Sequence, residues 1–181
     1  ELIKERISEI KSSGATCAVS ITPGKVNELA PVAIDSGIDI LVIQSTVTTA
    51  KYISDKESTL ILSDLIKQSS IPVVVGNCVS YETAMELIEA GASGLLIGVG
   101  PGAACTTREV TGVGIPQVTA TMNCSAARDD YFAKTGKYIP IITDGGIRTG
   151  GDICKSLVSG ADAVMLGTPL AQSSEAPGKG F

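Results

Sequence analysis

Histidine and tryptophan are absent from the 181-residue sequence, and basic residues are few. Without histidine, this chain supplies no Ser-His-Asp triad, Cys-His pair, HExxH zinc motif or histidine proton shuttle. The sequence holds 14 Lys and Arg residues against 19 Asp and Glu residues, a net charge of −5, with no basic run. We therefore expect neither nucleic acid nor a membrane as a partner, and any phosphate ligand must be held mainly by backbone N–H groups.

Long apolar runs and paired cysteine motifs are also lacking. No segment approaches the roughly 18 apolar residues of a membrane-spanning helix, and the amphipathic start ELIKERISEI does not resemble a signal peptide. The five cysteines form no CxxC motif, which argues against a zinc knuckle or a disulfide framework and predicts a cytoplasmic protein. Because the sequence begins with Glu1 rather than Met, we expect a processed or shortened chain.

Apolar residues make up 44% of the sequence, as expected for a domain that buries much of its surface. Runs rich in Val, Ile, Leu and Ala alternate with segments whose apolar residues recur every three or four positions. The runs predict strands buried on both faces at Thr16–Ile21, Asp39–Gln44, Pro72–Gly76, Gly94–Gly98, Ile139–Thr143 and Asp162–Leu166. The other segments predict helices at Pro23–Asp35, Lys56–Gln68, Tyr81–Glu89, Gln117–Lys134 and Gly151–Val158, after an N-terminal amphipathic helix.

Three helix–strand junctions share one pattern, in AIDSGIDILVI, LIEAGASGLLI and LVSGADAVML. Gly37, Gly91 and Gly160 stand where a helix C-terminus favours a left-handed residue, so we interpret them as caps. A repeated βα unit builds either a doubly wound sheet or a (β/α)8 TIM barrel, and both place ligands at the carboxyl ends of the strands. Glycine-rich turns late in the chain favour the α/β barrel, of which about six βα units are present.

The segment IGVGPGAACTTREVTGVGIPQ, residues 97–117, shows no regular period and predicts a long functional loop. It places Cys105 among glycines, and we interpret this residue as a nucleophile whose pKa is lowered by backbone dipoles and which alkylates selectively. The other four cysteines are expected to be buried and structural: Cys17, Cys78, Cys124 and Cys154.

Two glycine-rich turns follow the last two predicted strands. TDGGIR begins at Thr143, and LGT begins at Leu166. Turns of this kind, each facing a helix N-terminus, bind phosphate in many barrels through N–H groups and the helix dipole. Asp144 would accept hydrogen bonds from the hydroxyls of a ribose. The same pattern also suits an unrelated phosphate-binding barrel, such as a flavin enzyme.

Three segments together resemble the IMP dehydrogenase/GMP reductase family: GVGPGAACTTREVTGVGIPQ, IITDGGIRTGGDICKSLVSGADAVMLGTPLA and SSEAPG. The motif DGGIRTGGD is closer to the dehydrogenase, and with QSTVTT and GNC it resembles the bacterial IMP dehydrogenase-related subgroup. The similarity runs from about Thr16 through most of the chain. It implies that NAD oxidises inosine monophosphate to xanthosine monophosphate, in guanine nucleotide synthesis, through a covalent Cys105 thioimidate.

The resemblance also implies roles for individual residues. Thr107 would lie near the thioimidate, and the carbonyls of Gly100, Gly102 and Cys105 would hold a monovalent cation such as K⁺. The substrate nucleotide would contact Ala103, Asp144, Gly145, Gly146, Gly167 and Thr168. The NAD site would include Gln44, Ser45, Thr46, Asn77 and Gly98.

The sequence departs from the family pattern in several places. Ala103 replaces a serine that contacts phosphate, Gln44 replaces an aspartate beneath the nicotinamide ribose, and Leu96 replaces a basic residue. The first two barrel strands, the paired regulatory (CBS) modules and the mobile flap with its arginine have no counterpart in residues 1–181. We therefore expect a partial barrel that is inactive alone and belongs to a longer chain, which the resemblance predicts to be a homotetramer.

Two other functions stay open on the sequence. A GMP reductase-like enzyme would use the same thiol and nucleotide sites. A non-catalytic purine-nucleotide-binding fragment would account for the weakened contacts at Ala103 and Gln44.

Overall fold

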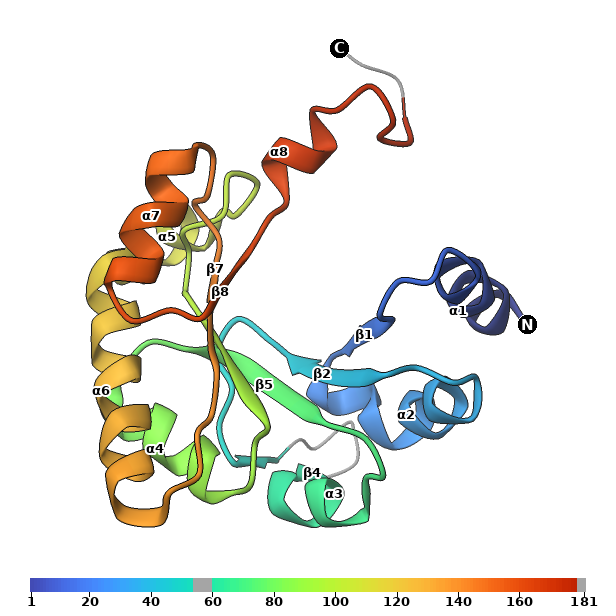
Figure 1. Cartoon of the computed structure of the whole chain (residues 1–181), viewed down its shortest axis with the longest axis horizontal. Helices are drawn as coiled ribbons and strands as arrows, with labels where there is room; N and C mark the ends of the chain where they lie inside the picture. Colours follow the sequence, from blue (N-terminus) through green and yellow to red (C-terminus); the bar gives the residue numbers. More distant parts are fainter. Residues whose placement is uncertain (54–59, 179–181) are drawn as a thin grey trace.

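The computed structural model describes residues 1–53 and 60–178, and its main feature is one curved parallel sheet (Figure 1). Six strands are hydrogen-bonded in the order β1-β2-β5-β6-β7-β8. Their bounds are β1 Ala18–Ile21, β2 Ile40–Gln44, β5 Val73–Cys78, β6 Gly94–Ile97, β7 Ile141–Asp144 and β8 Ala163–Met165. All six predicted strands are confirmed, with ends displaced by no more than about two residues, as is usual for strand boundaries.

Helices cover one side of this sheet. In Figure 1, α2, α3, α4 and α6 lie against its convex side, whereas α1 and α8 lie beyond its two edges. The helices are α1 Leu2–Ser12, α2 Val26–Asp35, α3 Leu62–Gln68, α4 Tyr81–Glu89, α5 Thr107–Thr111, α6 Gln117–Thr135, α7 Gly150–Val158 and α8 Thr168–Ala171, with a 3₁₀ turn η1 at Pro23–Lys25. Six parallel strands with a helical outer layer form part of a (β/α)8 barrel, which confirms the predicted fold class.

Two segments differ from the sequence prediction. The helix predicted over Lys56–Gln68 begins only at Leu62, because Leu60–Ile61 is a strand, β4, that pairs antiparallel with β3, Lys51–Tyr52. Residues 56–59 lie outside the described residues. The second difference is α5 within the loop predicted over residues 97–117. This single helical turn ends at Gly112, whose φ of +71° suits glycine.

The main core lies between the sheet and its helices. Side chains that alternate along the central strands point into it, and they include Leu41, Ile43, Val75, Leu95 and Ile97. The opposite face carries a smaller cluster around Val42, Val74 and Leu96. The prediction that every strand is buried on both faces is wrong for the edge strands, where Ala18, Ser20, Ala163 and Met165 are exposed. An edge strand has a neighbour on one side only, so less of its inner face is covered.

The repeated helix–strand junction has a structural explanation. Gly37, Gly91 and Gly160 have φ values of +88°, +103° and +103°, so their interpretation as caps is confirmed. The side chain two positions after each glycine then accepts a hydrogen bond from a backbone N–H group. That N–H group lies at the start of the strand that precedes the helix. Asp39 accepts from Cys17 N at 2.8 Å, Ser93 from Val73 N at 3.2 Å and Asp162 from Ile141 N at 2.7 Å. Each junction therefore fastens one βα unit to the next strand.

None of the helices in the described part of the chain combines the length and apolar character needed to cross a lipid bilayer.

Candidate active site

Two cavities meet at the carboxyl ends of the central strands. They share four lining residues, Gly102, Cys105, Asp144 and Gly145. The first has a volume of about 330 Å³, and its other lining residues are Gln44, Ser45, Thr46, Asn77, Gly98, Val99, Gly100 and Pro101. The second has a volume of about 410 Å³, and its other lining residues are Ala103, Ala104, Gly146, Ile147, Met165, Gly167, Thr168 and Ala171. Cys105 thus lines both cavities.

The residues named from the sequence for each ligand lie together, although Asp144 and Gly145 line both cavities. All five residues predicted to contact NAD line the first cavity, and all six predicted to contact the substrate line the second. Among the described residues, neither cavity is lined by Lys or Arg. An anionic ligand in the second cavity would therefore depend on backbone N–H groups and the Thr168 hydroxyl, as the acidic composition predicts.

Polar side chains from separate strands join at the mouth of the first cavity. Gln44 ends β2, Asn77 lies near the end of β5 and Asp144 ends β7. Gln44 Nε2 donates to Asp144 Oδ2 at 2.8 Å and to Asn77 Oδ1 at 3.0 Å, and Asn77 Nδ2 donates to the same Asp144 oxygen at 2.8 Å. Strand β6 lies between β5 and β7, and Gly98, just beyond its end, lines the same cavity.

Only glycine fits at position 98, because the surrounding atoms leave no room for a side chain. Its φ is +144°, and a Cβ there would lie 2.9 Å from the side-chain amide of Gln117. That amide donates to Ile97 O at 2.6 Å and to Asp144 O at 3.3 Å, so it joins the ends of β6 and β7. Glycine at this position therefore permits the close approach of the strands that carry the site.

Cys105 lies on the surface, just before α5. Its Sγ is 3.2 Å from Thr107 Oγ1, and its backbone N donates to Gly102 O at 3.1 Å. Hydrogen bonds from the Thr107 hydroxyl and the Thr107 backbone N–H, together with the charge of Arg108, hold the pKa of the Cys105 thiol below its ordinary value. An exposed thiol with a lowered pKa has the properties of a nucleophile.

Arg108 closes the loop that presents this thiol. Its guanidinium donates to Ile115 O at 2.6 Å, across the base of the loop. Its side chain passes beside Gly100 and Gly114, where an added Cβ would approach Arg108 to 2.6 Å and 2.5 Å respectively. The glycines that suggest a flexible loop in the sequence thus make room for a side chain that holds the loop together.

The turn after β7 faces the second cavity. Gly145 and Gly146 have successive positive φ values of +97° and +79°, and a Cβ on Gly145 would lie 2.8 Å from the Pro101 ring. At the start of α7, Thr149 and Asp152 form a capping box: Asp152 Oδ2 accepts from the backbone N–H groups of Arg148 and Thr149, and Thr149 Oγ1 accepts from that of Asp152.

The carbonyls of Gly100, Gly102 and Cys105 fit a monovalent cation by their chemistry. Neutral backbone oxygens suit an alkali ion, which exchanges its hydration shell for such ligands. The loop between Gly100, with φ of +84°, and Cys105 is closed by the Gly102 hydrogen bond described above. In the described part of the chain, no group of three or more His, Cys, Asp or Glu side chains is placed to hold a metal ion.

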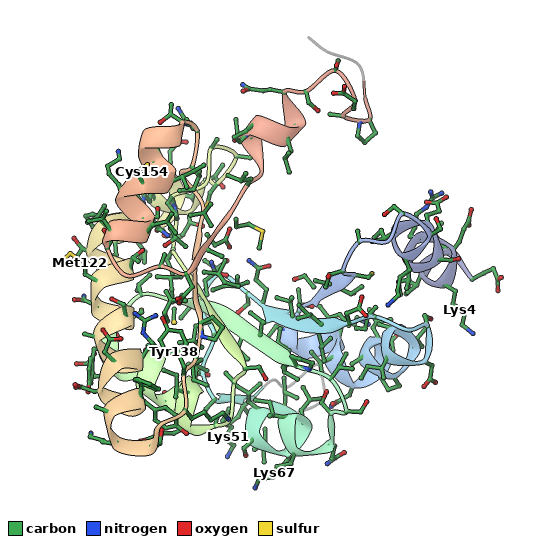
Figure 2. All side chains as sticks on the ribbon, in the orientation of Figure 1. Lys4, Lys51, Lys67, Met122, Tyr138 and Cys154 are labelled. Carbon is green, nitrogen blue, oxygen red and sulfur yellow. The ribbon has the colours of Figure 1, made fainter. Side chains whose placement is uncertain are left out.

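Three of the other cysteines are buried as predicted: Cys17, Cys78 and Cys124. A hydrogen bond with Cys124, together with burial, raises the pKa of the Cys78 thiol, which makes it unreactive. The prediction is wrong for Cys154, which is exposed on α7 (Figure 2). The buried residue of that helix is Ser156, so α7 packs through the face that carries Ser156. The Cys154 thiol is left in solvent.

Two residues that hold the site together, Gln117 and Ser20, have no role predicted from the sequence. Gln117 joins β6 to β7, and Ser20 Oγ donates to Gln44 Oε1 at 3.1 Å. The role of Ser20 could have been predicted from the sequence, because Ser20 is the polar residue of an otherwise apolar strand. That strand lies next to the strand that ends at Gln44. The role of Gln117 depends on contacts with residues distant in the sequence, so no local sequence pattern predicts it.

Substituting Thr107 with valine is expected to slow the alkylation of Cys105 near neutral pH. The thiolate is the reactive form, and loss of the Thr107 hydroxyl moves the pKa of Cys105 upward, toward its ordinary value of 9.0. Iodoacetamide labelling followed by peptide mass spectrometry across a pH series measures this. In the wild type, we expect Cys105 to react before the exposed Cys154, because its pKa is lowered from the ordinary value.

The conservative variant Thr107→Ser is the control, since it keeps the hydroxyl and should restore the labelling profile. Equal profiles for the valine and serine variants, or labelling of Cys154 ahead of Cys105 in the wild type, would show that the hydroxyl does not activate this thiol.

Comparison with known proteins identifies relatives along the whole chain. A family model described as "IMP dehydrogenase / GMP reductase domain" matches residues 5–181. An uncharacterized oxidoreductase of Mycobacterium tuberculosis is 40% identical over 183 residues, covering 100% of this chain and 49% of that protein. A GMP reductase of Leishmania major is 42% identical over 84% of the chain and 30% of its own length. An inosine-5′-monophosphate dehydrogenase of Cryptosporidium parvum is 44% identical over 85% of the chain and 36% of its own length.

A solved structure shows the same fold. The crystal structure of an IMP dehydrogenase/GMP reductase-like protein from Corynebacterium glutamicum superposes with a TM-score of 0.86 and 38% sequence identity. The match covers 96% of this chain and 45% of that chain. The chain therefore spans about half the length of this protein and of the mycobacterial relative.

Proposed function

Because the chain belongs to the IMP dehydrogenase/GMP reductase family of oxidoreductases, we propose that its protein oxidises inosine 5′-monophosphate to xanthosine 5′-monophosphate with NAD. One observation carries the proposal. The exposed Cys105, with its lowered pKa, lines both a cavity suited to a nucleoside monophosphate and an adjoining cavity suited to a second ligand. A thiol between two ligands is positioned to react with one while a hydride passes to the other.

The second cavity supplies the contacts that a nucleoside monophosphate needs. Asp144 presents a carboxylate to the ribose hydroxyls, and the backbone around Gly146 and Gly167, with the Thr168 hydroxyl, receives the phosphate. Ala103 lines the same cavity without offering a hydroxyl. Affinity for the phosphate therefore depends on neutral hydrogen-bond donors. How well these donors bind phosphate depends on where the backbone conformation of Gly145 and Gly146 places the N–H groups of the turn.

The chemistry begins with the thiolate of Cys105. Its sulfur adds to C2 of the hypoxanthine ring and forms a C–S bond, and the hydrogen at C2 then leaves with its electron pair as a hydride. Bound in the first cavity, NAD⁺ supplies the hydride acceptor. Water next adds to C2 of the thioimidate, the C–S bond breaks and the thiolate is regenerated. Overall, IMP, NAD⁺ and water give XMP, NADH and one proton.

Thr107 and the loop carbonyls support this chemistry. The Thr107 hydroxyl, 3.2 Å from the sulfur, stabilises the thiolate that attacks and that later leaves. A monovalent cation held by the carbonyls of Gly100, Gly102 and Cys105 would order the same loop and orient the sulfur. The side chains of Ser45 and Thr46, with Gly98, line the first cavity, where they would contact NAD.

A reductive reaction on the same site is the second candidate, favoured by the similarity to the Leishmania GMP reductase. In that direction Cys105 attacks C2 of GMP, the 2-amino group leaves as ammonia, and a hydride from NADPH then displaces the sulfur. GMP, NADPH and two protons give IMP, NADP⁺ and ammonium. Cys105, Asp144 and the phosphate turns would serve both reactions.

Two assays on the protein that carries this chain separate the reactions. We expect NADH absorbance to appear when IMP and NAD⁺ are supplied, with the rate increased by K⁺. NADPH consumption with release of ammonium from GMP, and no NADH from IMP, would replace the proposal with the reductase. Tight IMP binding without turnover and without covalent labelling of Cys105 would replace it with a non-catalytic nucleotide-binding function.

A further inference from the structure

The amide of Gln44 is fully engaged in hydrogen bonds within the protein. Its Nε2 donates to Asp144 Oδ2 at 2.8 Å and to Asn77 Oδ1 at 3.0 Å, and its Oε1 accepts from Ser20 Oγ at 3.1 Å. A side-chain amide has two N–H groups. Both are directed at protein acceptors, so Gln44 retains no N–H for a ligand in the first cavity.

The carboxylate of Asp144 is held on one side only. Its Oδ2 accepts from Gln44 Nε2 and from Asn77 Nδ2, each at 2.8 Å. Among residues 1–53 and 60–178, Asp144 Oδ1 accepts no hydrogen bond, and Asp144 lines both cavities. Two neutral donors on one oxygen fix the plane of the carboxylate and leave the other oxygen for a ligand.

A neutral amide at position 44 suits this arrangement better than an acid would. A carboxylate at the position of the Gln44 side chain would offer no N–H to Asp144 Oδ2, and it would place a second negative charge at hydrogen-bond distance. Asn77, the other donor to Oδ2, is also neutral. The cluster therefore carries one charge, on Asp144, and no basic residue lines either cavity in the described structure.

We propose that Gln44 is a positioning residue for substrate: its amide orients Asp144 so that the free carboxylate oxygen receives the ribose hydroxyls of the nucleoside monophosphate. This inference rests on the proposed function. It assigns Gln44, which the family resemblance placed in the NAD site, to the ribose end of the substrate site. It also makes recognition of the ribose depend on a chain of contacts that begins at Ser20 on β1 and crosses the sheet to β7.

The test compares nucleotides with and without ribose hydroxyls. Calorimetry on the protein that carries this chain would measure binding of IMP and of its 2′,3′-dideoxy analogue to wild type, Gln44→Glu and Gln44→Met. Loss of hydrogen bonds to a charged group should weaken IMP binding by about 10- to 100-fold, more for glutamate than for methionine. Binding of the dideoxy analogue should change by less than about 3-fold, because it has no hydroxyl for Asp144 to bind.

The matched control is Gln68→Glu, the same amide-to-acid change at an exposed position at the end of α3. It should leave the binding of both nucleotides unchanged. If the Gln44 variants weaken both nucleotides equally, or neither, Gln44 does not act through Asp144 and the inference is overturned.

A crystal structure of Gln44→Met decides the positioning role without any nucleotide. We expect the Asp144 carboxylate to rotate away from Asn77 or to adopt two orientations, and an unchanged carboxylate would refute the inference. Failure of the proposed function is distinguishable from this result. It would show as a wild-type protein that binds neither IMP nor GMP, whatever the orientation of Asp144 in the variant.

Discussion

Replacing Cys105 with alanine is expected to abolish turnover of IMP, with a fall in kcat of about 10⁴-fold or more, as follows when a covalent nucleophile is removed. Nucleotide affinity should change by less than about 3-fold, because the ribose and phosphate contacts come from Asp144, Gly146, Gly167 and Thr168 rather than from the sulfur. NADH absorbance gives the rate, and calorimetry with IMP gives the affinity.

Cys154→Ala is the control for this substitution. Cys154 is the other exposed cysteine, lies on α7 and lines neither of the two cavities. The Cys154→Ala variant should retain the wild-type rate of IMP turnover and the wild-type labelling of Cys105 by substrate. Turnover by the Cys105→Ala variant within about tenfold of wild type would rule out the covalent mechanism, since no such rate survives loss of the attacking atom.

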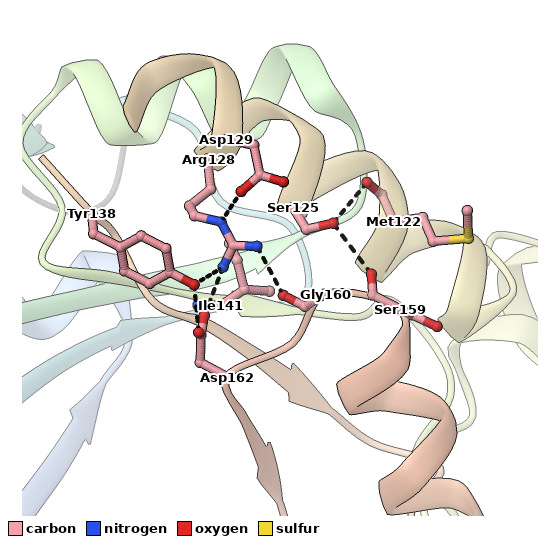
Figure 3. A network of polar contacts seen from close by, with 9 residues as sticks. All are labelled: Met122, Ser125, Arg128, Asp129, Tyr138, Ile141, Ser159, Gly160 and Asp162. Atoms are coloured by element: carbon pink, nitrogen blue, oxygen red, sulfur yellow. Dashed lines mark hydrogen bonds and ion pairs between the residues drawn. The ribbon is translucent and has the colours of Figure 1, made fainter. Parts of the chain in front are cut away.

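Replacing Asp162 with alanine is expected to lower the free energy of unfolding by about 2–4 kcal/mol, because it leaves a buried arginine without its main partner. Figure 3 shows the network at the start of β7. Arg128 has a side chain that is 7% exposed, and its Nη1 donates to Asp162 Oδ2 at 2.9 Å. The same carboxylate accepts from Tyr138 at 2.6 Å and from Ile141 N at 2.7 Å.

The size of this effect follows from what remains when the carboxylate is gone. Arg128 would keep Asp129, the Gly160 carbonyl at 3.2 Å and the ring of Tyr138, 4.7 Å from its guanidinium carbon. Of these, only the Gly160 carbonyl lies at the junction where α7 leads into β8, and it is uncharged. The backbone N–H of Ile141 would also lose its acceptor, which adds the cost of an unsatisfied donor.

Asp129→Ala is the matched control, because it too removes a carboxylate partner of Arg128. The Asp129 side chain is 65% exposed, so its ion pair is screened by water and the loss should be about 1 kcal/mol or less. Urea unfolding of the two variants measures the difference. Equal losses would mean that the lower exposure of the Asp162 side chain, 32% against 65% for Asp129, does not determine the contribution of its ion pair.

The sequence predicted much of the fold because the relevant signals are local. Apolar runs such as the one ending at Gln44 and the three- and four-residue spacing of α4 depend only on neighbours along the chain. The hairpin of β3 with β4 was missed because Leu60–Ile61 becomes a strand by pairing with Lys51–Tyr52, which no local pattern records. The exposure of Cys154 was missed for a related reason, since the packed face of α7 is chosen by its neighbours in space.

The candidate site likewise has features that the sequence predicts and features that depend on the tertiary structure. The sequence by itself determined which residues stand at the carboxyl ends of the strands, and so indicated Cys105, Asp144 and the glycine turns as chemistry-bearing residues. Only the tertiary structure decided that Gln44 and Asp144, 100 positions apart, share a hydrogen bond and that Arg108 closes the loop of Cys105. A strand pattern specifies where a side chain leaves the sheet, whereas its partner depends on which strands become neighbours and on how closely glycine lets them approach.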